Sequence, residues 1–161
     1  MTVDWPYAEG RGRPASRRGA GATPLVLVVA DHTLISVLMR DTLQSYGFRV
    51  LIAHDAQEGI RLTWALRPDV ILMDICLPGM SGLEATRIIK SSPTLRQIPI
   101  VAVTAHAMSG DQEKILEGGC EGYLSKPFRM ADLERAVHEA LAKRRGPRLL
   151  PPAIEDLPQA S

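Results

Sequence analysis

Residues 69–86 read DVILMDICLPGMSGLEAT, and the fold can be worked out from this stretch. Asp69 to Met73 is a short apolar run, which is typical of a strand that is covered on both faces of a sheet. Ser81, with Glu84 three residues later, is the pattern that opens a helix. A buried strand followed by a helix is therefore predicted here.

The same alternation continues on both sides of this stretch. The other strand-like runs are Leu25–Val29, Arg49–Ala53, Ile98–Val103 and Gly122–Ser125. The helical patterns are Leu34 with Ile35, Leu38, Thr42 and Tyr46, stopped at Gly47; Asp55 with Glu58, bounded by Pro68; Asp111–Glu117; and Leu133 with Val137, Ala140 and Leu141. Five short strands alternating with helices predict an α/β fold with a parallel sheet and helices on both faces.

The composition of the runs predicts the strand order. The first, third and fourth runs are apolar at nearly every position, as interior strands must be. The second run has Arg49 and His54 at its ends, and the fifth contains Ser125, so these two are expected at the edges. This arrangement matches the flavodoxin-like, doubly wound order 2-1-3-4-5.

Composition and length set limits on the class of protein. The chain has 161 residues, 45% of them hydrophobic and 23% charged, with a formal net charge of +1. That charge does not support nucleic-acid binding. The apolar runs are far shorter than the ~20 residues that span a bilayer, so no membrane association and a cytoplasmic location are predicted. Cys76 and Cys120 form no C-x-x-C pattern, which argues against a disulfide scaffold or a structural zinc site.

Composition also divides the chain. Residues 1–24 are rich in Gly, Arg, Ala and Pro and are predicted to be a disordered extension. Residues 146–161 contain four prolines and are predicted to be a flexible tail. Residues 25–145 are the expected folded domain, with no attached output domain.

Polar residues stand at or just past the carboxyl ends of four predicted strands, where an open parallel sheet binds its ligand. They are Asp31, Asp74, Thr104 and Lys126. Carboxylates are ligands for Mg²⁺, and a carboxylate can also accept a phosphoryl group. Lysine and threonine side chains suit phosphoryl oxygens. Nucleotide-binding glycine motifs are absent, so the phosphoryl group is expected from another molecule.

Three segments, residues 70–82, 101–107 and 122–128, resemble the signature segments of receiver domains in two-component signalling, and the resemblance extends over about residues 25–145. It implies that Asp74 accepts a phosphoryl group from a phosphohistidine on a histidine kinase or histidine phosphotransfer protein. It further implies that Mg²⁺ is held by Asp31, Asp74 and the backbone carbonyl of Cys76. No enzymatic activity is implied beyond self-phosphorylation and self-dephosphorylation at Asp74.

The resemblance also assigns a switch. Thr104 and Lys126 would hold the phosphoryl oxygens, Lys126-Pro127 is a cis peptide in similar proteins, and Tyr123 stands where receivers carry an aromatic residue that changes rotamer. The face formed by the fourth helix, fifth strand and fifth helix would then change shape and contact a downstream protein.

The sequence departs from the family pattern after the first strand, where receivers usually carry two adjacent acids and this chain has Ala30 and Asp31. The missing acid is expected to weaken metal-dependent chemistry, and it leaves open a pseudo-receiver that binds partners without phosphorylation. Cys76 and His106 should flank the site, at positions that tune the lifetime of the phosphoryl group.

A phosphatase of the haloacid dehalogenase type also combines a nucleophilic Asp with Thr or Ser and Lys. That family places its nucleophile after the first strand, with a second Asp two residues later. In this chain Asp74 follows the third strand and Cys76 stands two residues on, so the phosphatase pattern does not fit.

Overall fold

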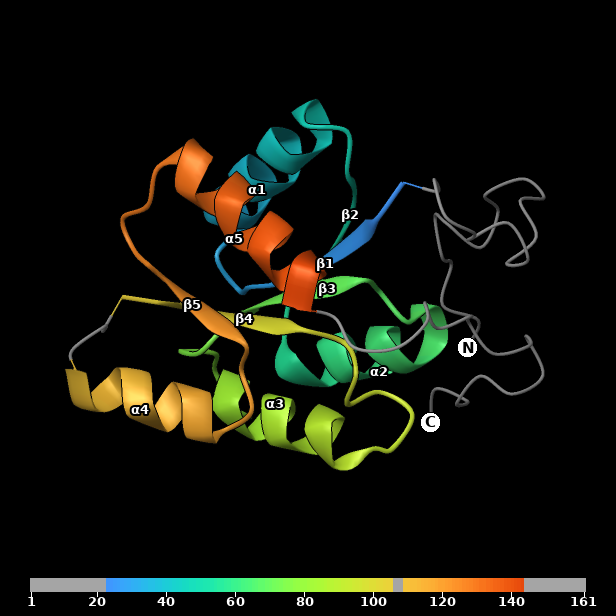
Figure 1. Ribbon diagram of the computed structural model, residues 1–161, viewed down its shortest axis with the longest axis vertical. Coiled ribbons are helices and arrows are strands. Elements are labelled where there is room, and N and C mark those ends of the chain that lie inside the picture. Colours follow the sequence, from blue (N-terminus) through green and yellow to red (C-terminus); the bar gives the residue numbers. More distant parts are fainter. Residues whose placement is uncertain (1–22, 106–108, 144–161) are drawn as a thin grey trace.

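The computed structural model describes residues 23–105 and 109–143, which form one parallel five-stranded sheet with helices on both faces (Figure 1). The sheet order is β2-β1-β3-β4-β5, which confirms the predicted flavodoxin-like topology. The strands are β1 (Leu25–Val29), β2 (Arg49–Ala53), β3 (Val70–Asp74), β4 (Ile100–Thr104) and β5 (Gly122–Ser125). The helices are α1 (Thr33–Ser45), α2 (Ala56–Leu66), α3 (Gly82–Ser91), α4 (Ser109–Glu117) and α5 (Met130–Lys143).

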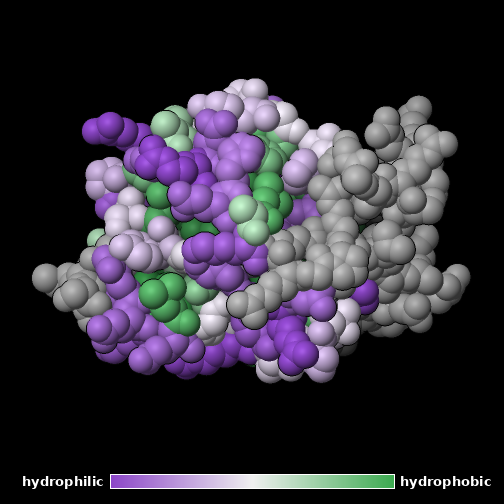
Figure 2. Space-filling model, in the orientation of Figure 1, coloured by the Kyte–Doolittle hydropathy of each residue, from purple (hydrophilic) through white to green (hydrophobic). Residues whose placement is uncertain are grey.

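Two hydrophobic clusters lie on opposite faces of the sheet, because successive strand residues point to opposite sides. Leu27 and Val29 join the cluster covered by α2, α3 and α4. Val26 and Val28 join the cluster covered by α1 and α5. In the coloured part of the face seen in Figure 2, hydrophilic residues predominate, with smaller groups of apolar residues visible among them.

Strand burial follows the predicted interior and edge positions. Every residue of β1, β3 and β4 is buried, whereas Arg49 in β2 is exposed and only Leu124 is buried in β5. The two edge strands are therefore the ones that leave part of their residues accessible to solvent.

Strands β3 and β4 both start and end later than the predicted runs. Asp69 lies before β3 rather than in it, because its buried carboxylate accepts a hydrogen bond from the backbone N–H of Leu25, at 2.8 Å. Ile98 lies in a turn, where its N–H donates to the carbonyl of Leu95. At their other ends, β3 and β4 each extend one residue beyond the predicted runs, so Asp74 and Thr104 are the last strand residues rather than the first residues beyond.

Helix α1 lies where it was predicted, but it turns a different face inward. Its buried residues are Ser36, Met39 and Leu43, whereas Leu34 is 77% exposed and Leu38 is 50% exposed. Ser36 can face the sheet because its hydroxyl donates to the carbonyl of Thr33, so no polar group is left unsatisfied.

Side chains cap the starts of α2 and α3, as the Ser/Asp…Glu spacing predicted. Asp55 accepts a hydrogen bond from the N–H of Glu58, and Ser81 accepts one from the N–H of Glu84. These caps fix where the two helices begin relative to the strands before them.

The predicted extension at residues 1–24 (apart from Thr23 and Pro24) and the predicted tail at 146–161 lie outside the described residues. None of the helices in the described ranges has the length and apolar character that crossing a bilayer requires.

Candidate functional site

The carboxyl ends of the strands bring the predicted residues to one edge of the sheet. Asp74 ends β3 and is paired with Val103, and Thr104 ends β4 and is paired with Ser125 of β5. Lys126 follows immediately, and its N–H donates to the carbonyl of Thr104, at 2.8 Å. The parallel register therefore places the last residues of three strands side by side.

The carboxylate of Asp74 contacts two of the groups at this end of the sheet. The residue is only 4% exposed, and its Oδ2 lies 3.1 Å from Nζ of Lys126. Its Oδ1 accepts a hydrogen bond from the N–H of Cys76, at 3.0 Å. Both oxygens are thus engaged, so neither acceptor of this nearly buried carboxylate is left unsatisfied.

The loop after β3 is closed by Gly82, whose role the sequence reasoning missed. The Gly82 N–H donates to the carbonyl of Ile75, and a Cβ at position 82 would lie 2.1 Å from the carbonyl oxygen of Asp74. Only glycine allows this close approach of helix to strand. The hydrogen bond from the Cys76 N–H to the Asp74 carboxylate lies within this closely packed loop.

Ala30 is buried like Asp74, but its side chain is apolar. Ala30 is 5% exposed and belongs to the apolar cluster under α1 and α5, and its N–H donates to the carbonyl of Ala53. The next residue, Asp31, has an exposed side chain. This end of the sheet therefore offers one accessible carboxylate after β1 and one nearly buried carboxylate at the last residue of β3.

The remaining predicted residues take different positions around the edge. Thr104 is 3% exposed, whereas Tyr123 is 38% exposed on β5. The Lys126-Pro127 peptide bond is cis, as the resemblance implied. His106 lies outside the described residues.

The two cysteines differ in environment. Cys76 is exposed beside Asp74. Cys120 is buried, and this burial raises the pKa of its thiol to about 11, although its hydrogen bond to Thr86 acts in the opposite direction. The ordinary value is 9.0, so Cys120 stays protonated and unreactive near neutral pH.

The metal ligands predicted from the sequence are of the type that suits Mg²⁺. In the described part of the chain, no three side chains of His, Cys, Asp or Glu gather as a possible metal cluster. Asp31, Asp74 and the carbonyl of Cys76 are all oxygen donors, and Mg²⁺ usually takes one or two protein carboxylates and keeps several waters. Two carboxylates on one sheet edge fit that requirement.

Known proteins resemble this chain in sequence and in structure. The sequence model of the response regulator receiver domain matches residues 26–138. The polar-differentiation response regulator DivK of Brucella anthropi is 47% identical over 103 residues, covering 64% of this chain and 84% of DivK.

Solved protein structures also resemble this chain in fold. The receiver domain of the sensor histidine kinase PA1611 of Pseudomonas aeruginosa, which has a magnesium ion coordinated in its active-site cleft, is 36% identical with a TM-score of 0.70, covering 75% of this chain and 99% of that one. The chemotaxis protein CheY4 of Vibrio cholerae is 28% identical with a TM-score of 0.71, covering 74% of this chain and 99% of that one.

Proposed function

The chain belongs to the response regulator receiver domain family, and from that premise we propose that Asp74 is its phosphorylation site. The observation that carries the proposal is the Asp74 carboxylate itself. It lies at the carboxyl edge of the sheet with Lys126 Nζ 3.1 Å from one oxygen and the Cys76 N–H 3.0 Å from the other. A nucleophilic carboxylate beside a cation and a backbone donor is equipped to accept a phosphoryl group.

The phosphoryl donor is a phosphohistidine on a histidine kinase or histidine phosphotransfer protein. A carboxylate oxygen of Asp74 forms a bond to phosphorus as the nitrogen–phosphorus bond breaks, and the imidazole leaves. Lys126, which pairs with Asp74 beforehand, then neutralises charge on the phosphoryl oxygens. The hydroxyl of Thr104, at the end of the neighbouring strand, donates a further hydrogen bond to them.

Asp31, Asp74 and the backbone carbonyl of Cys76 would hold Mg²⁺, since all three offer oxygen ligands. When bound, the ion supplies positive charge that stabilises the phosphoryl group during transfer. Ala30 contributes no second carboxylate, so the protein provides fewer negative charges near the ion than a pair of adjacent acids would.

Phosphorylation is read out through the face formed by α4, β5 and α5. Tyr123 lies on β5 with its side chain 38% exposed, three residues before Lys126. A phosphoryl group that draws in Thr104 and Lys126 shifts the population toward a state in which Tyr123 turns inward. A downstream protein in the cytoplasm then binds the changed face.

The test is an intact-mass measurement after treatment with acetyl phosphate and Mg²⁺. One added phosphate is expected on the wild-type protein and none on Asp74→Asn. Asp41→Asn is the matched control, because Asp41 is an exposed aspartate that pairs with Arg40 on α1. A wild-type protein that stays unlabelled would favour the pseudo-receiver, and a labelled Asp74→Asn variant would show that another residue accepts the phosphate.

A further inference from the structure

Lys126 directly follows β5, which is an edge strand of the sheet. Among the described residues, β5 forms backbone hydrogen bonds to a strand on one side only. It has four residues, pairs only with β4, and buries only Leu124. Burial of alternate side chains normally specifies strand register, so a short edge strand with one buried residue needs additional support.

Glu121, directly before β5, forms two hydrogen bonds to the first residue of β4. Its backbone N–H donates to the carbonyl of Ile100, at 2.9 Å. Its carboxylate oxygen Oε2 accepts a hydrogen bond from the N–H of the same Ile100, at 2.6 Å. One residue thus binds both backbone groups of the first residue of β4 on the side that faces β5.

Lys90 holds this carboxylate from α3. Its Nζ donates to Oε1 of Glu121 and to the carbonyls of Arg96, at 3.0 Å, and Ile98, at 2.7 Å. These three bonds use all the donors of an ammonium group. The side chain is only 15% exposed, so its position is well defined.

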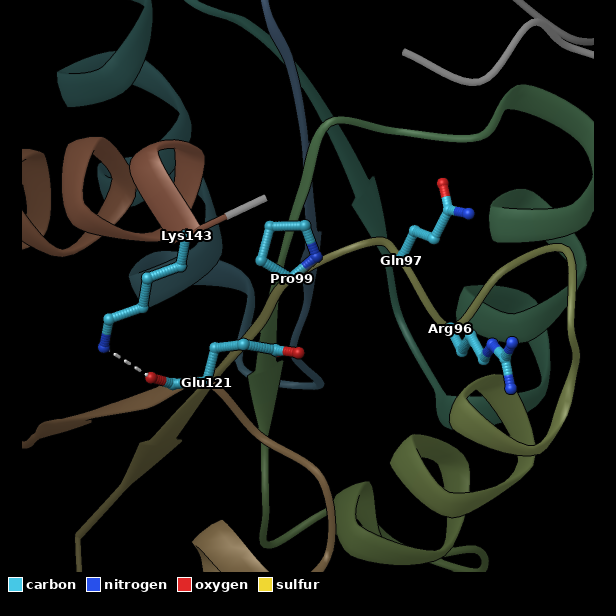
Figure 3. Close-up of a pocket in the computed structure, with 5 residues that line it drawn as sticks. All are labelled: Arg96, Gln97, Pro99, Glu121 and Lys143. Atoms are coloured by element: carbon cyan, nitrogen blue, oxygen red, sulfur yellow. Dashed lines mark hydrogen bonds between the residues drawn. The ribbon is translucent and has the colours of Figure 1, made fainter. Parts of the chain in front are cut away.

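Lys143 holds Glu121 from α5. Figure 3 shows its side chain reaching from the end of α5 toward Glu121, where Nζ donates to the backbone carbonyl at 2.9 Å. Glu121 is therefore tied to α3, β4 and α5, at the end of the sheet opposite Asp74.

We propose that Glu121, held by Lys90, is a positioning residue that sets the register of β5 and thereby places Lys126 over Asp74. A strand rises about 3.3 Å per residue, so a slip of one position would move Lys126 by about that distance. The contact between Lys126 Nζ and Asp74 Oδ2 is 3.1 Å, and such a slip would break it. The role of Lys126 toward the phosphoryl group rests on the function proposed above.

The first experiment measures amide hydrogen exchange by NMR in the unphosphorylated full-length protein. Glu121→Gln replaces one carboxylate oxygen by an NH₂ donor, so it can no longer accept from Ile100 through one oxygen and from Lys90 through the other. It is expected to raise exchange at the Lys126 amide, which donates to Thr104, at least about tenfold more than at the Ala30 amide, which donates to Ala53. A uniform loss of stability would raise both rates by the same factor.

The matched control is Glu58→Gln. Glu58 is also a carboxylate that accepts a backbone N–H, from His54, but it lies at the start of α2, away from β5. It should not favour the Lys126 amide over the Ala30 amide. Equal rises at Lys126 and Ala30 in Glu121→Gln would overturn the proposal.

The second experiment is a double-mutant cycle on the acetyl phosphate labelling rate of Asp74. If Glu121 acts through Lys126, Glu121→Gln slows labelling about tenfold in the wild-type background and has no further effect in Lys126→Ala. The same fold-change in both backgrounds would overturn it. If wild-type Asp74 is not labelled at all, the proposed phosphorylation fails, and the exchange experiment alone decides whether Glu121 positions Lys126.

Discussion

Replacing Gly82 by alanine tests how closely the loop around Asp74 is packed. The added Cβ would lie 2.1 Å from the carbonyl oxygen of Asp74 and 2.8 Å from the Cα of Ile75, both backbone atoms that cannot rotate away. The start of α3 must therefore move away from β3. That movement lengthens the hydrogen bond from the Gly82 N–H to the Ile75 carbonyl, which is 3.0 Å in the wild type.

The expected loss of stability follows from these contacts. Overpacking costs about 1–3 kcal/mol, and the weakened hydrogen bond adds about 1 kcal/mol. Alanine offsets this loss by about 0.5–1 kcal/mol of stability, because glycine loses more backbone freedom than alanine on folding. We expect Gly82→Ala to lower the free energy of unfolding by about 1–3 kcal/mol, measured by urea denaturation.

Phosphorylation should be affected as well. Moving the start of α3 displaces the loop that joins it to Asp74, and with it the Cys76 N–H that contacts the Asp74 carboxylate. Because small displacements of reacting groups cost large factors in rate, acetyl phosphate labelling should slow by about tenfold or more.

Gly122→Ala is the matched control. A Cβ at position 122 would have no atom within 4 Å, and the residue does not have a positive φ. This variant should be as stable as the wild type or up to about 1 kcal/mol more stable. The packing argument is refuted if Gly82→Ala unfolds at the wild-type urea concentration and labels at the wild-type rate.

Three other perturbations have defined expected results. Lys126→Ala should still be labelled on Asp74 but should lose the phosphorylation-dependent NMR shift of the Tyr123 ring, and an unchanged shift would disprove the coupling role of Lys126. Ala30→Asp should bind Mg²⁺ about 10- to 100-fold more tightly by calorimetry, because a neighbouring carboxylate is gained. The same variant should be less stable without metal, since that carboxylate enters an apolar cluster; equal Mg²⁺ affinity would contradict the argument. Burial raises the pKa of the Cys120 thiol from 9.0 to about 11, so the thiol ionises in the unfolded chain before it ionises in the folded protein. The contribution of the neutral thiol to the free energy of unfolding is therefore fully present below pH 9 and is lost as the pH rises toward about 11. Urea unfolding across that range should therefore show a steeper decline for the wild type than for Cys120→Ala, and parallel curves would exclude this cause.

Much of the fold could be read from local patterns. The runs at Leu25–Val29, Arg49–Ala53 and Gly122–Ser125 coincide with β1, β2 and β5, because hydrophobic run length and flanking turn residues are local properties. The edge positions of β2 and β5 followed from their polar residues, since an interior parallel strand is covered on both faces. The order of the sheet then brought Asp74 and Lys126 to one edge.

Helix α1 shows where local pattern is insufficient. Its apolar residues form more than one stripe, and only packing against the sheet and α5 decides that Met39 and Leu43 face inward while Leu34 and Leu38 face solvent. The boundary at Asp69 was likewise decided by a partner 44 positions away, the N–H of Leu25.

The sequence by itself determined the alternation of strands and helices, the strand order, and which polar residues stand at the strand ends. Only the tertiary structure decided which atoms meet: Lys126 Nζ with Oδ2 of Asp74, the start of α3 at Gly82 with the Asp74 carbonyl, and Glu121 with Lys90 and Ile100. The physical reason is that periodicity and capping act over a few residues. Contacts between residues 8 to 52 positions apart, in contrast, depend on how the completed layers pack against one another.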